Sequence, residues 1–466
     1  MNADYNAIMP AYHVENFGCR ATQADGAAIE RELLWRGLSP AGGPERADVV
    51  VFNTCTVTAA ADADARAAIR RVHRDNPDCK IMVTGCYAQR APGEIAALPG
   101  VTWVVGNSHK PRVAGIASEG VQSTANANFV PLHQIALDHH PRSPSFQLVD
   151  DIFAHTELMA APVFDFSSDS AGSASRTRPN LKVQDGCNNR CSFCVIPFVR
   201  GQSRSLALEE VLREVNALVS AGFREIVLSG INLGRWGRDF ASSQRFEDLL
   251  KTILKSTDIE RLRISSVEPM DWSDELIELV TSSPRICKHA HVPLQSGSDQ
   301  VLRLMHRKYR PWHYADRIRK IRTSMPNAAI GADVMVGFPG ETDQLFEESR
   351  RFIEDLSFTY LHVFTYSSRP GTAAAAMADH VPVQLARERN EILRNLIGEK
   401  NRVFRASFVG QQIEAITLRR RGEGFTDALT NNFIKLQLMG LHEPNLLLKT
   451  SITGVTPDGL TGTLLN

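Results

Sequence analysis

Short apolar runs alternate with amphipathic segments at the start of the chain. Three such runs are AYHVENFGC (11–19), ADVVVFNTC (47–55) and KIMVTGC (80–86). Each is followed by a segment in which apolar residues recur at helical spacing, such as AAADADARAAIRRVHRDN after the second run. Buried strands that alternate with helices are typical of a parallel sheet covered by helices. The pattern therefore predicts an N-terminal parallel α/β domain over residues 10–115.

The periodic pattern is lost between residues 112 and 178. Here the chain looks irregular, and FDFSSDSAGSASRTRP (164–179) consists mainly of small and polar residues. Such composition is typical of a linker. We expect residues 116–175 to form a connecting segment.

Alternation resumes at LKVQDGC and continues to about residue 400. Further strand candidates are EIVLSG, RLRISSVEP, KHAHVPLQSG, AIGADVMVGFPG and LHVFTYSSRPG. Helical stretches such as LALEEVLREVNALVSAG and TDQLFEESRRFIEDL separate them. Six consecutive βα units are enough for an open or partial (β/α)6 barrel, which we place at residues 176–400.

A third pattern occupies residues 401–466. QQIEAITLRR, FIKLQLMG, NLLLKTSITGV and GLTGTLLN are short strand candidates separated by Gly, Asn and Pro. They predict a small all-β barrel at the C-terminus.

Composition narrows the classes of function. The 466 residues include 52 Lys and Arg and 52 Asp and Glu, so a nucleic-acid partner must be held by local basic patches. No apolar run approaches the ~18 residues of a membrane span, and the first residues lack a secretory signal. We therefore expect a cytoplasmic protein without a membrane partner. Eight cysteines in such a chain favour metal or redox chemistry over disulfides.

Cys187, Cys191 and Cys194 form a C-x3-C-x2-C loop directly after the first predicted barrel strand. A structural zinc site needs four ligands, and no histidine lies near enough in sequence to supply the fourth. Thiolates in the cytosol otherwise favour iron–sulfur clusters. Three thiolates on a four-iron cluster leave one iron open to bind a substrate or cofactor. Zinc or incidental cysteines remain the alternative.

Cys19, Cys55 and Cys86 lie far apart in sequence, yet each ends a predicted strand and precedes a helix. The C-terminal ends of parallel strands lie along one edge of a sheet, so these cysteines can converge. We expect nearby helix N-termini to stabilise their thiolates. The alternative is three buried, small apolar residues. Cys79 and Cys287 each precede a strand, and we interpret both as structural.

The C-x3-C-x2-C loop resembles the signature of the radical S-adenosylmethionine (SAM) superfamily. The resemblance implies a [4Fe–4S] cluster whose open iron binds SAM and whose electron splits it to a 5′-deoxyadenosyl radical.

Longer motifs resemble the radical-SAM methylthiotransferases over essentially the whole chain. They are FGCRATQADGAAIE, NTCTVTAAADADARAAIRR, GCYAQ, HVPLQSGSD, GADVMVGFPGET, HVFTYSSRPGTAA and GEGFTDALTNNFIKLQL. The family fold is an N-terminal Rossmann-like α/β domain, a partial radical SAM barrel and a C-terminal RNA-binding barrel called TRAM. The resemblance implies a second [4Fe–4S] cluster on Cys19, Cys55 and Cys86, whose open iron carries the sulfur to be inserted.

Within this family, NTCTVT, GCNNRCSFCVIPFVRG and LSGINLGRWG are most similar to the branch that acts on threonylcarbamoyladenosine in tRNA. The isopentenyladenosine branch usually has an acidic residue in place of Asn188. This sequence departs from the family at FGCR, where Leu-Gly-Cys-Lys is commoner, but it keeps the cysteine. The resemblance implies methylthiolation at C2 of that nucleoside at tRNA position 37, with two SAM molecules and an electron donor such as flavodoxin or ferredoxin. The alternatives are the isopentenyladenosine branch, the ribosomal-protein aspartate branch, and a non-enzymatic iron–sulfur RNA-binding protein.

Further candidates for SAM or nucleotide binding lie in the cysteine loop and at the ends of barrel strands. They are Phe193, Ser229, Gly230, Asn232, Ser265, Ser266, Glu268, Gln295 and Ser296. A core aromatic or local turn capping is the alternative for these positions. The superfamily's Gly-Gly-Glu motif is absent at the end of the second strand.

Basic residues in the terminal barrel are candidates for RNA binding: Arg419, Arg420 and Arg421. The basic run HRKYRP (306–311) is interpreted instead as a solvated surface. We expect Phe433 to fill the terminal barrel, because it alternates within a strand pattern.

Overall fold

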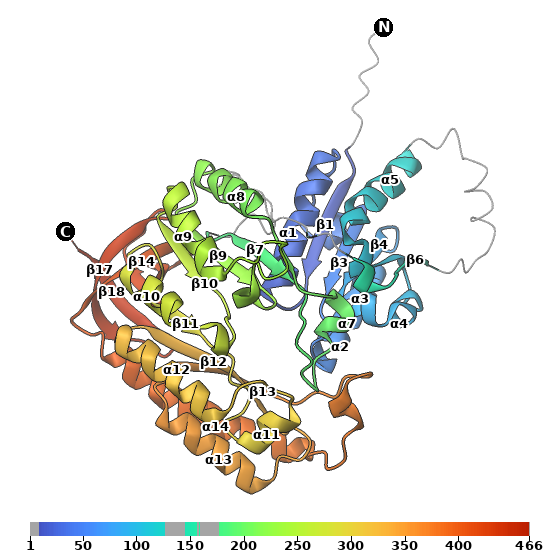
Figure 1. Ribbon diagram of the computed structural model, residues 1–466. Helices are drawn as coiled ribbons and strands as arrows, with labels where there is room; N and C mark the ends of the chain where they lie inside the picture. Colours follow the sequence, from blue (N-terminus) through green and yellow to red (C-terminus); the bar gives the residue numbers. More distant parts are fainter. Residues whose placement is uncertain (1–8, 126–144, 156–157, 159–176, 466) are drawn as a thin grey trace. The chain divides into compact units, whose positions relative to one another are not determined.

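The computed structural model describes residues 9–125, 145–155, 158 and 177–465 (Figure 1). The chain forms two compact units. The first unit contains residues 1–175, 186–188 and 195–202, and the second contains residues 176–185, 189–194 and 203–466. Among the described residues, no helix is both long enough and apolar enough to cross a membrane.

The first unit is built on one parallel sheet with strand order β2-β1-β3-β4-β5-β6. Its strands are β1 (Ala11–Asn16), β2 (Ser39–Pro40), β3 (Val49–Thr54), β4 (Lys80–Gly85), β5 (Val101–Gly106) and β6 (Phe146–Leu148). Every residue of β3 is buried. A strand buried on both faces is apolar throughout, which explains the run VVVF.

Helices cover both faces of this sheet. They are α1 (Arg20–Trp35), α2 (Ala59–Asp75), α3 (Cys86–Arg90), α4 (Pro92–Ala96) and α5 (Val113–Ala125), with short 3-10 turns at Pro44–Arg46, Asn107–Arg112 and Ile152–Ala154. Val49 and Val51 pack in the core formed with α1 and α5. Val50 and Phe52 pack in the core formed with α2, α3 and α4. Successive side chains of β3 point to opposite faces of the sheet, so they pack in two separate cores, one on each face.

The N-terminal parallel α/β prediction is confirmed, but the expectation of irregular structure from residue 112 is wrong in part. Helix α5 and strand β6 lie within that stretch. Most of the expected linker, 164–179, lies outside the described residues.

The second unit contains six parallel strands in two sheets, β10-β9-β7-β8 and β11-β12-β13, where the short strand β8 is antiparallel. Parallel bridges from Leu262 to Ile286 and from Ser266 to His291 link β10 to β11. The strands are β7 (Asn180–Asp185), β8 (Arg204–Ser205), β9 (Glu225–Gly230), β10 (Arg261–Ile264), β11 (His289–His291), β12 (Ala329–Val336) and β13 (Tyr360–Thr365). This order confirms the partial (β/α)6 barrel.

Helices connect successive barrel strands, and one more helix leads from β13 to the terminal barrel. They are α8 (Leu208–Ser220), α9 (Phe246–Ser256), α10 (Asp274–Ser282), α11 (Asp299–Leu304), α12 (Pro311–Ser324), α13 (Asp343–Asp355) and α14 (Val383–Ala406), with short 3-10 turns at Leu233–Arg235, Pro269–Asp271 and Ala373–Ala376. The short helix α7 (Ile196–Arg200) belongs to the first unit. Side-chain oxygens of Ser273 and Thr342 cap α10 and α13, which fixes where these helices begin.

The last five strands close into a barrel of order β14-β15-β16-β18-β17. They are β14 (Gln412–Gly422), β15 (Phe425–Thr430), β16 (Lys435–Met439), β17 (Leu447–Val455) and β18 (Leu460–Leu464). This confirms the small all-β barrel. The prediction for Phe433 is wrong, because it stands in the β15–β16 turn with φ of 68° and packs against His289 and Tyr360 of the barrel strands.

Candidate metal centres

The three distant cysteines of the first unit lie at one edge of its sheet. Cys19 follows β1 and precedes α1, Cys55 follows β3, and Cys86 begins α3 directly after β4. Strands β1, β3 and β4 are parallel neighbours. Their C-terminal ends therefore bring the three cysteines to the same edge, as the sequence predicts.

Two close contacts hold this edge together. Gly18 has φ of 101°, and a Cβ atom at this position would lie 2.5 Å from Cβ and 2.7 Å from Sγ of Cys55. Only glycine fits here. The side-chain amide of Asn107 donates to Sγ of Cys86 at 3.5 Å and to the Val199 carbonyl at 2.7 Å. Asn107 is therefore a partner of this site, although no local sequence pattern indicates it.

Burial and the neighbouring thiols raise the pKa of Cys55 to about 12. Burial is the largest cause, followed by the nearby Cys86, while the Val57 amide and Arg200 act in the opposite direction. The expected stabilisation of the free thiolate is therefore wrong for Cys55. A buried cysteine of this kind ionises readily when a metal binds it. The thiols of Cys19, Cys55 and Cys86 are free, both of the others act on the pKa of Cys55, and thiolates are the ligands that iron–sulfur clusters use.

A buried charge cluster lies in the same unit. The carboxylate of Asp25 accepts hydrogen bonds from Lys110 at 2.7 Å and from Arg200 at 3.0 Å. All three side chains are at most 6% exposed. Asp25 thus fixes Arg200, the cation that acts on Cys55. A cluster assembled from residues 25, 110 and 200 has no local sequence signal.

Cys79 and Cys287 behave as predicted. Cys79 is buried just before β4, at the end of that strand opposite to Cys86, and burial raises its pKa to about 11. Cys287 is buried just before β11. Neither cysteine lies at the C-terminal edge of its sheet.

The C-x3-C-x2-C loop follows β7, the first barrel strand, as predicted. Within the first unit, the Cys187 amide donates to the Gly201 carbonyl at 3.1 Å. Within the second unit, the Cys194 amide donates to the Cys191 carbonyl at 3.1 Å. Ser192 anchors the loop by donating its amide to Met305 at 3.1 Å and accepting from the Ala374 amide at 2.8 Å.

Arg307 binds this loop directly, so the interpretation of 306–311 as a solvated surface is wrong for it. Its side chain is 5% exposed, donates to Sγ of Cys191 at 3.2 Å and forms an ion pair with Glu268. Glu268 thus pairs with Arg307, and its predicted role in binding SAM or nucleotide stays a prediction. The sequence signal was present in HRKYRP, but burial of one arginine within a basic run cannot be read from charge alone.

Phe193 lies between the cysteines and packs edge-to-face on Phe338, with ring centroids 6.3 Å apart. Ser229 donates its hydroxyl to the Leu181 carbonyl at 3.5 Å. These contacts are local ones, and a role in SAM binding stays a prediction.

Gln184 organises the end of the second strand. Its side-chain carbonyl accepts from the Asn232 amide at 2.7 Å. A Cβ atom on Gly230 would lie 2.9 Å from the same oxygen. Gln184 is fully buried and was not identified from the sequence.

The remaining barrel candidates bind neighbouring backbone. The Ser265 amide donates to the Leu228 carbonyl at 3.0 Å, and Ser266 bridges to His291. Gln295 has φ of 67° and donates its amide to the Asp333 carbonyl at 2.8 Å. The Ser296 hydroxyl accepts from the Ser298 amide at 3.2 Å. A role in ligand binding stays a prediction for all of them.

The three arginines of β14 differ in environment. The Arg419 amide donates to the Thr177 hydroxyl at 3.1 Å. Arg420 is 88% exposed, and Arg421 donates to the His442 carbonyl at 2.9 Å. Arg420 is therefore the most accessible candidate for RNA.

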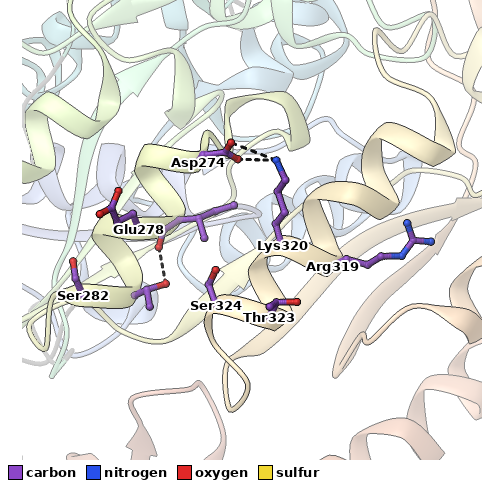
Figure 2. A pocket seen from close by; sticks show the side chains of 9 residues that line it. Asp274, Glu278, Ser282, Arg319, Lys320, Thr323 and Ser324 are labelled. Carbon is purple, nitrogen blue, oxygen red and sulfur yellow. Dashed lines mark hydrogen bonds and ion pairs between the residues drawn. The ribbon is translucent and has the colours of Figure 1, made fainter.

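A groove of about 550 Å³ lies elsewhere, between α10 and α12 (Figure 2). Asp274 and Lys320 form an ion pair at one end of it. The groove contains none of the predicted site residues, so it is not the candidate centre.

Comparisons with known proteins identify the family of the chain. Residues 181–353 match the model of the radical SAM superfamily, and residues 11–106 match that of Uncharacterized protein family UPF0004. The chain is similar to the threonylcarbamoyladenosine tRNA methylthiotransferase MtaB of Bacillus subtilis, with 37% identity over 93% of this chain and 91% of the relative. It is also similar to the tRNA-2-methylthio-N(6)-dimethylallyladenosine synthase of Thermobifida fusca, with 33% identity over 89% of this chain and 79% of the relative.

A solved structure supports the fold alone. The radical S-adenosylmethionine methyltransferase TsrM from Kitasatospora setae has a TM-score of 0.54 and 15% identity, covering 76% of this chain and 72% of that one. The radical SAM domain model and these relatives establish SAM and [4Fe–4S] clusters as the cofactors. The chain belongs to the radical-SAM tRNA methylthiotransferase family.

Proposed function

We propose that this enzyme inserts a methylthio group at C2 of N6-threonylcarbamoyladenosine at position 37 of tRNA. The observation that carries the proposal is similarity to relatives named for this activity. Five threonylcarbamoyladenosine tRNA methylthiotransferases, from organisms as different as Bacillus subtilis and Thermotoga maritima, are 31–37% identical over at least 93% of this chain.

Two thiolate sets would hold two clusters. Cys187, Cys191 and Cys194 would hold the cluster that binds SAM, and Cys19, Cys55 and Cys86 would hold an auxiliary cluster. When bound, the clusters and two SAM molecules supply the electron, radical, methyl group and sulfur that substitution of an unactivated C–H bond requires.

The protein's own side chains fix these thiols. Arg307 places a buried cation against Cys191, and Glu268 holds that cation in position. The neutral side-chain amide of Asn107 donates a hydrogen bond to Sγ of Cys86, and the Val57 backbone amide donates to Sγ of Cys55 at 3.5 Å. Hydrogen bonds to sulfur and low exposure tune the potentials of iron–sulfur clusters. The reductant of this enzyme would be a flavodoxin or a ferredoxin.

Nucleoside analysis tests the proposal. The chain is expressed in a host that lacks its own threonylcarbamoyladenosine methylthiotransferase, and nucleosides from total tRNA are measured by mass spectrometry. We expect 2-methylthio-threonylcarbamoyladenosine to appear. Methylthiolated isopentenyladenosine alone would assign the chain to the other tRNA branch. A methylthiolated ribosomal-protein aspartate without a tRNA product would contradict the proposal.

Cysteine variants separate the two sites. Cys191→Ala should abolish SAM cleavage, measured as 5′-deoxyadenosine after anaerobic reduction. Cys55→Ala should retain cleavage and lose methylthiolated tRNA, because only the auxiliary site is damaged. Cys79→Ala is the matched control, since Cys79 is equally buried in the same unit and should keep both activities. Full product from Cys55→Ala would contradict the auxiliary role. Absence of 5′-deoxyadenosine from the unmodified enzyme would favour a non-enzymatic protein.

A further inference from the structure

Three side chains outside the cysteine sites meet on one face of the β11–β12–β13 sheet. Nε2 of His291 lies 3.2 Å from Oδ2 of Asp333, and Nδ1 of His362 lies 3.3 Å from Oδ1 of Asp333. One potential ligand atom from each residue lies within 4.8 Å of those from the other two. In the described part of the chain, this is the one group of histidine, cysteine and acidic side chains that meets so closely.

Strand register explains the meeting. Asp333 of β12 pairs with His362 of β13, and Gly331 of β12 pairs with His291 of β11. Side chains two residues apart on a strand share a face, so all three functional side chains lie on the same side of the sheet. A site built on strands is held more rigidly than one built on loops.

Tyr360 orients the buried histidine. Its ring lies over Gly331, where a Cβ atom would come within 2.0 Å of the ring. Its hydroxyl then forms hydrogen bonds with Nδ1 of His291 at 2.9 Å and Nε2 of His289 at 2.7 Å. Nε2 of His291 is left facing Asp333. Metal-binding histidines are typically oriented through their second ring nitrogen in this manner.

The group is buried on the side of His291 and open to solvent on the side of His362. The side chain of His291 is 7% exposed, that of Asp333 28%, and that of His362 64%. A structural zinc site is closed by four protein ligands, whereas three ligands with an open side leave room for water or an oxygen ligand.

We propose that His291, Asp333 and His362 bind a divalent first-row metal ion. Two imidazoles and one carboxylate form a ligand set used by zinc and by non-haem iron. Ligand atoms about 2.0–2.1 Å from a tetrahedral ion are roughly 3.3 Å apart. The observed separations of 3.2 and 3.3 Å match this value. The three ligand atoms already lie within 4.8 Å of one another, so side-chain rotations alone would bring them to one ion.

The metal site shares its face with the cysteine loop. Met335 and Phe364 stand two residues beyond Asp333 and His362, and both pack in a cluster with Phe193. Two residues of strand span about 6.6 Å, so the metal site lies one layer of side chains from the loop. If the proposed function holds, the carboxylate of the threonylcarbamoyl group is the substrate ligand of matching chemistry.

Manganese binding tests the site without the reaction. The reconstituted holoenzyme is dialysed against Mn²⁺, which prefers nitrogen and oxygen ligands to thiolates and leaves the clusters intact. We expect one specific ion per chain. His362→Ala should weaken binding by more than about 100-fold, beyond the roughly 10–100-fold expected of an outer-shell change. Since His362 is mostly exposed, this variant should fold normally. His313→Ala, an exposed histidine on α12, is the matched control and should bind as the unmodified enzyme does.

Two more variants complete the test. Asp333→Asn should lose binding, and Tyr360→Phe should weaken it by about tenfold while one ion per chain is still reached at saturation. Absence of binding at millimolar Mn²⁺, or unchanged affinity in both His362→Ala and Asp333→Asn, would overturn the metal site. The Mn²⁺ measurement needs no tRNA, so it is independent of the reaction. Intact Mn²⁺ binding in an enzyme that forms no 2-methylthio-threonylcarbamoyladenosine would contradict the proposed function and support the metal site.

Discussion

Gly18 stands at the tightest point of the N-terminal cysteine site. Its backbone is in the left-handed region, with φ of 101°, and its α-carbon faces Cys55. A side chain at this position would push directly against the sulfur and strain the turn. The geometry of the auxiliary site therefore depends on a residue that binds no metal.

Gly18→Ala should impair the auxiliary site selectively. Methylthiolated tRNA is expected to fall by at least tenfold, while formation of 5′-deoxyadenosine continues, because Cys55 is displaced by the new methyl group. The yields of both products in one reaction give the measurement. Gly93→Ala is the control, since no atom would lie within 4 Å of its new Cβ. Equal loss of both products, or loss of neither, would contradict this account of Gly18.

The sequence predicts the role of a single residue where the evidence lies in neighbouring positions of the chain. Cys191 and Cys194 were identified by their spacing, and Cys55 by its place after a strand. Arg307 and Gln184 were not, because their partners depend on the packing of distant segments. Arg307 is 116 residues from Cys191 in sequence.

Strands β9 and β10 carry a buried ion cluster, and this cluster links both strands to the terminal barrel. Glu225 accepts from Arg263 at 2.8 Å, and neither side chain is exposed. Arg263 also donates to the Thr430 carbonyl at 3.1 Å. Burial alone would raise the pKa of Glu225, but Arg263 and two further arginines hold it below its usual value.

Glu225→Gln should destabilise the second unit by about 3–5 kcal/mol, because buried arginines lose their counter-charge. The lowered pKa means that Glu225 stabilises the fold fully above pH ~4.3 and less as pH falls below that value. Chemical denaturation at several pH values measures both effects. The variant should lose less stability than the unmodified enzyme on acidification below pH ~4.3. Equal acid dependence would contradict this role of Glu225.

Elements were predictable where apolar periodicity was strong, as in β3 and the barrel strands. The sequence does not predict helix α5, because it contains Gly115 and Gly120, which lower helix propensity. A Cβ atom on Gly120 would lie 2.3 Å from the Trp103 ring. Close packing against β5 therefore favours the helix that local propensity does not, and such packing is not visible in the sequence.

The whole molecule has no net charge, so any binding of nucleic acid must come from local basic patches. The sequence predicts the terminal barrel as a domain of its own, and in the structure it belongs to the same compact unit as the strands before it. Arg261 and Arg263 make contacts with barrel residues 153 and 167 positions away. Contacts over such sequence distances have no periodic signal.

We predict that the terminal barrel contributes to tRNA affinity through phosphate contacts. The double variant Arg420→Ala/Arg421→Ala should weaken tRNA binding by about tenfold and lower the slope of log affinity against log salt by about 1–2. Filter binding at several salt concentrations measures both. Arg213→Ala on α8 removes a similarly exposed charge and should leave the slope unchanged. An unchanged slope in the double variant would exclude these arginines from the RNA interface.

Two independent clusters on two sets of three cysteines are the central claim, and iron analysis tests it most directly. After anaerobic reconstitution, the unmodified enzyme should hold about eight irons per chain, and Cys55→Ala and Cys191→Ala about four each. About four irons in the unmodified enzyme, or about eight in Cys55→Ala, would contradict the claim.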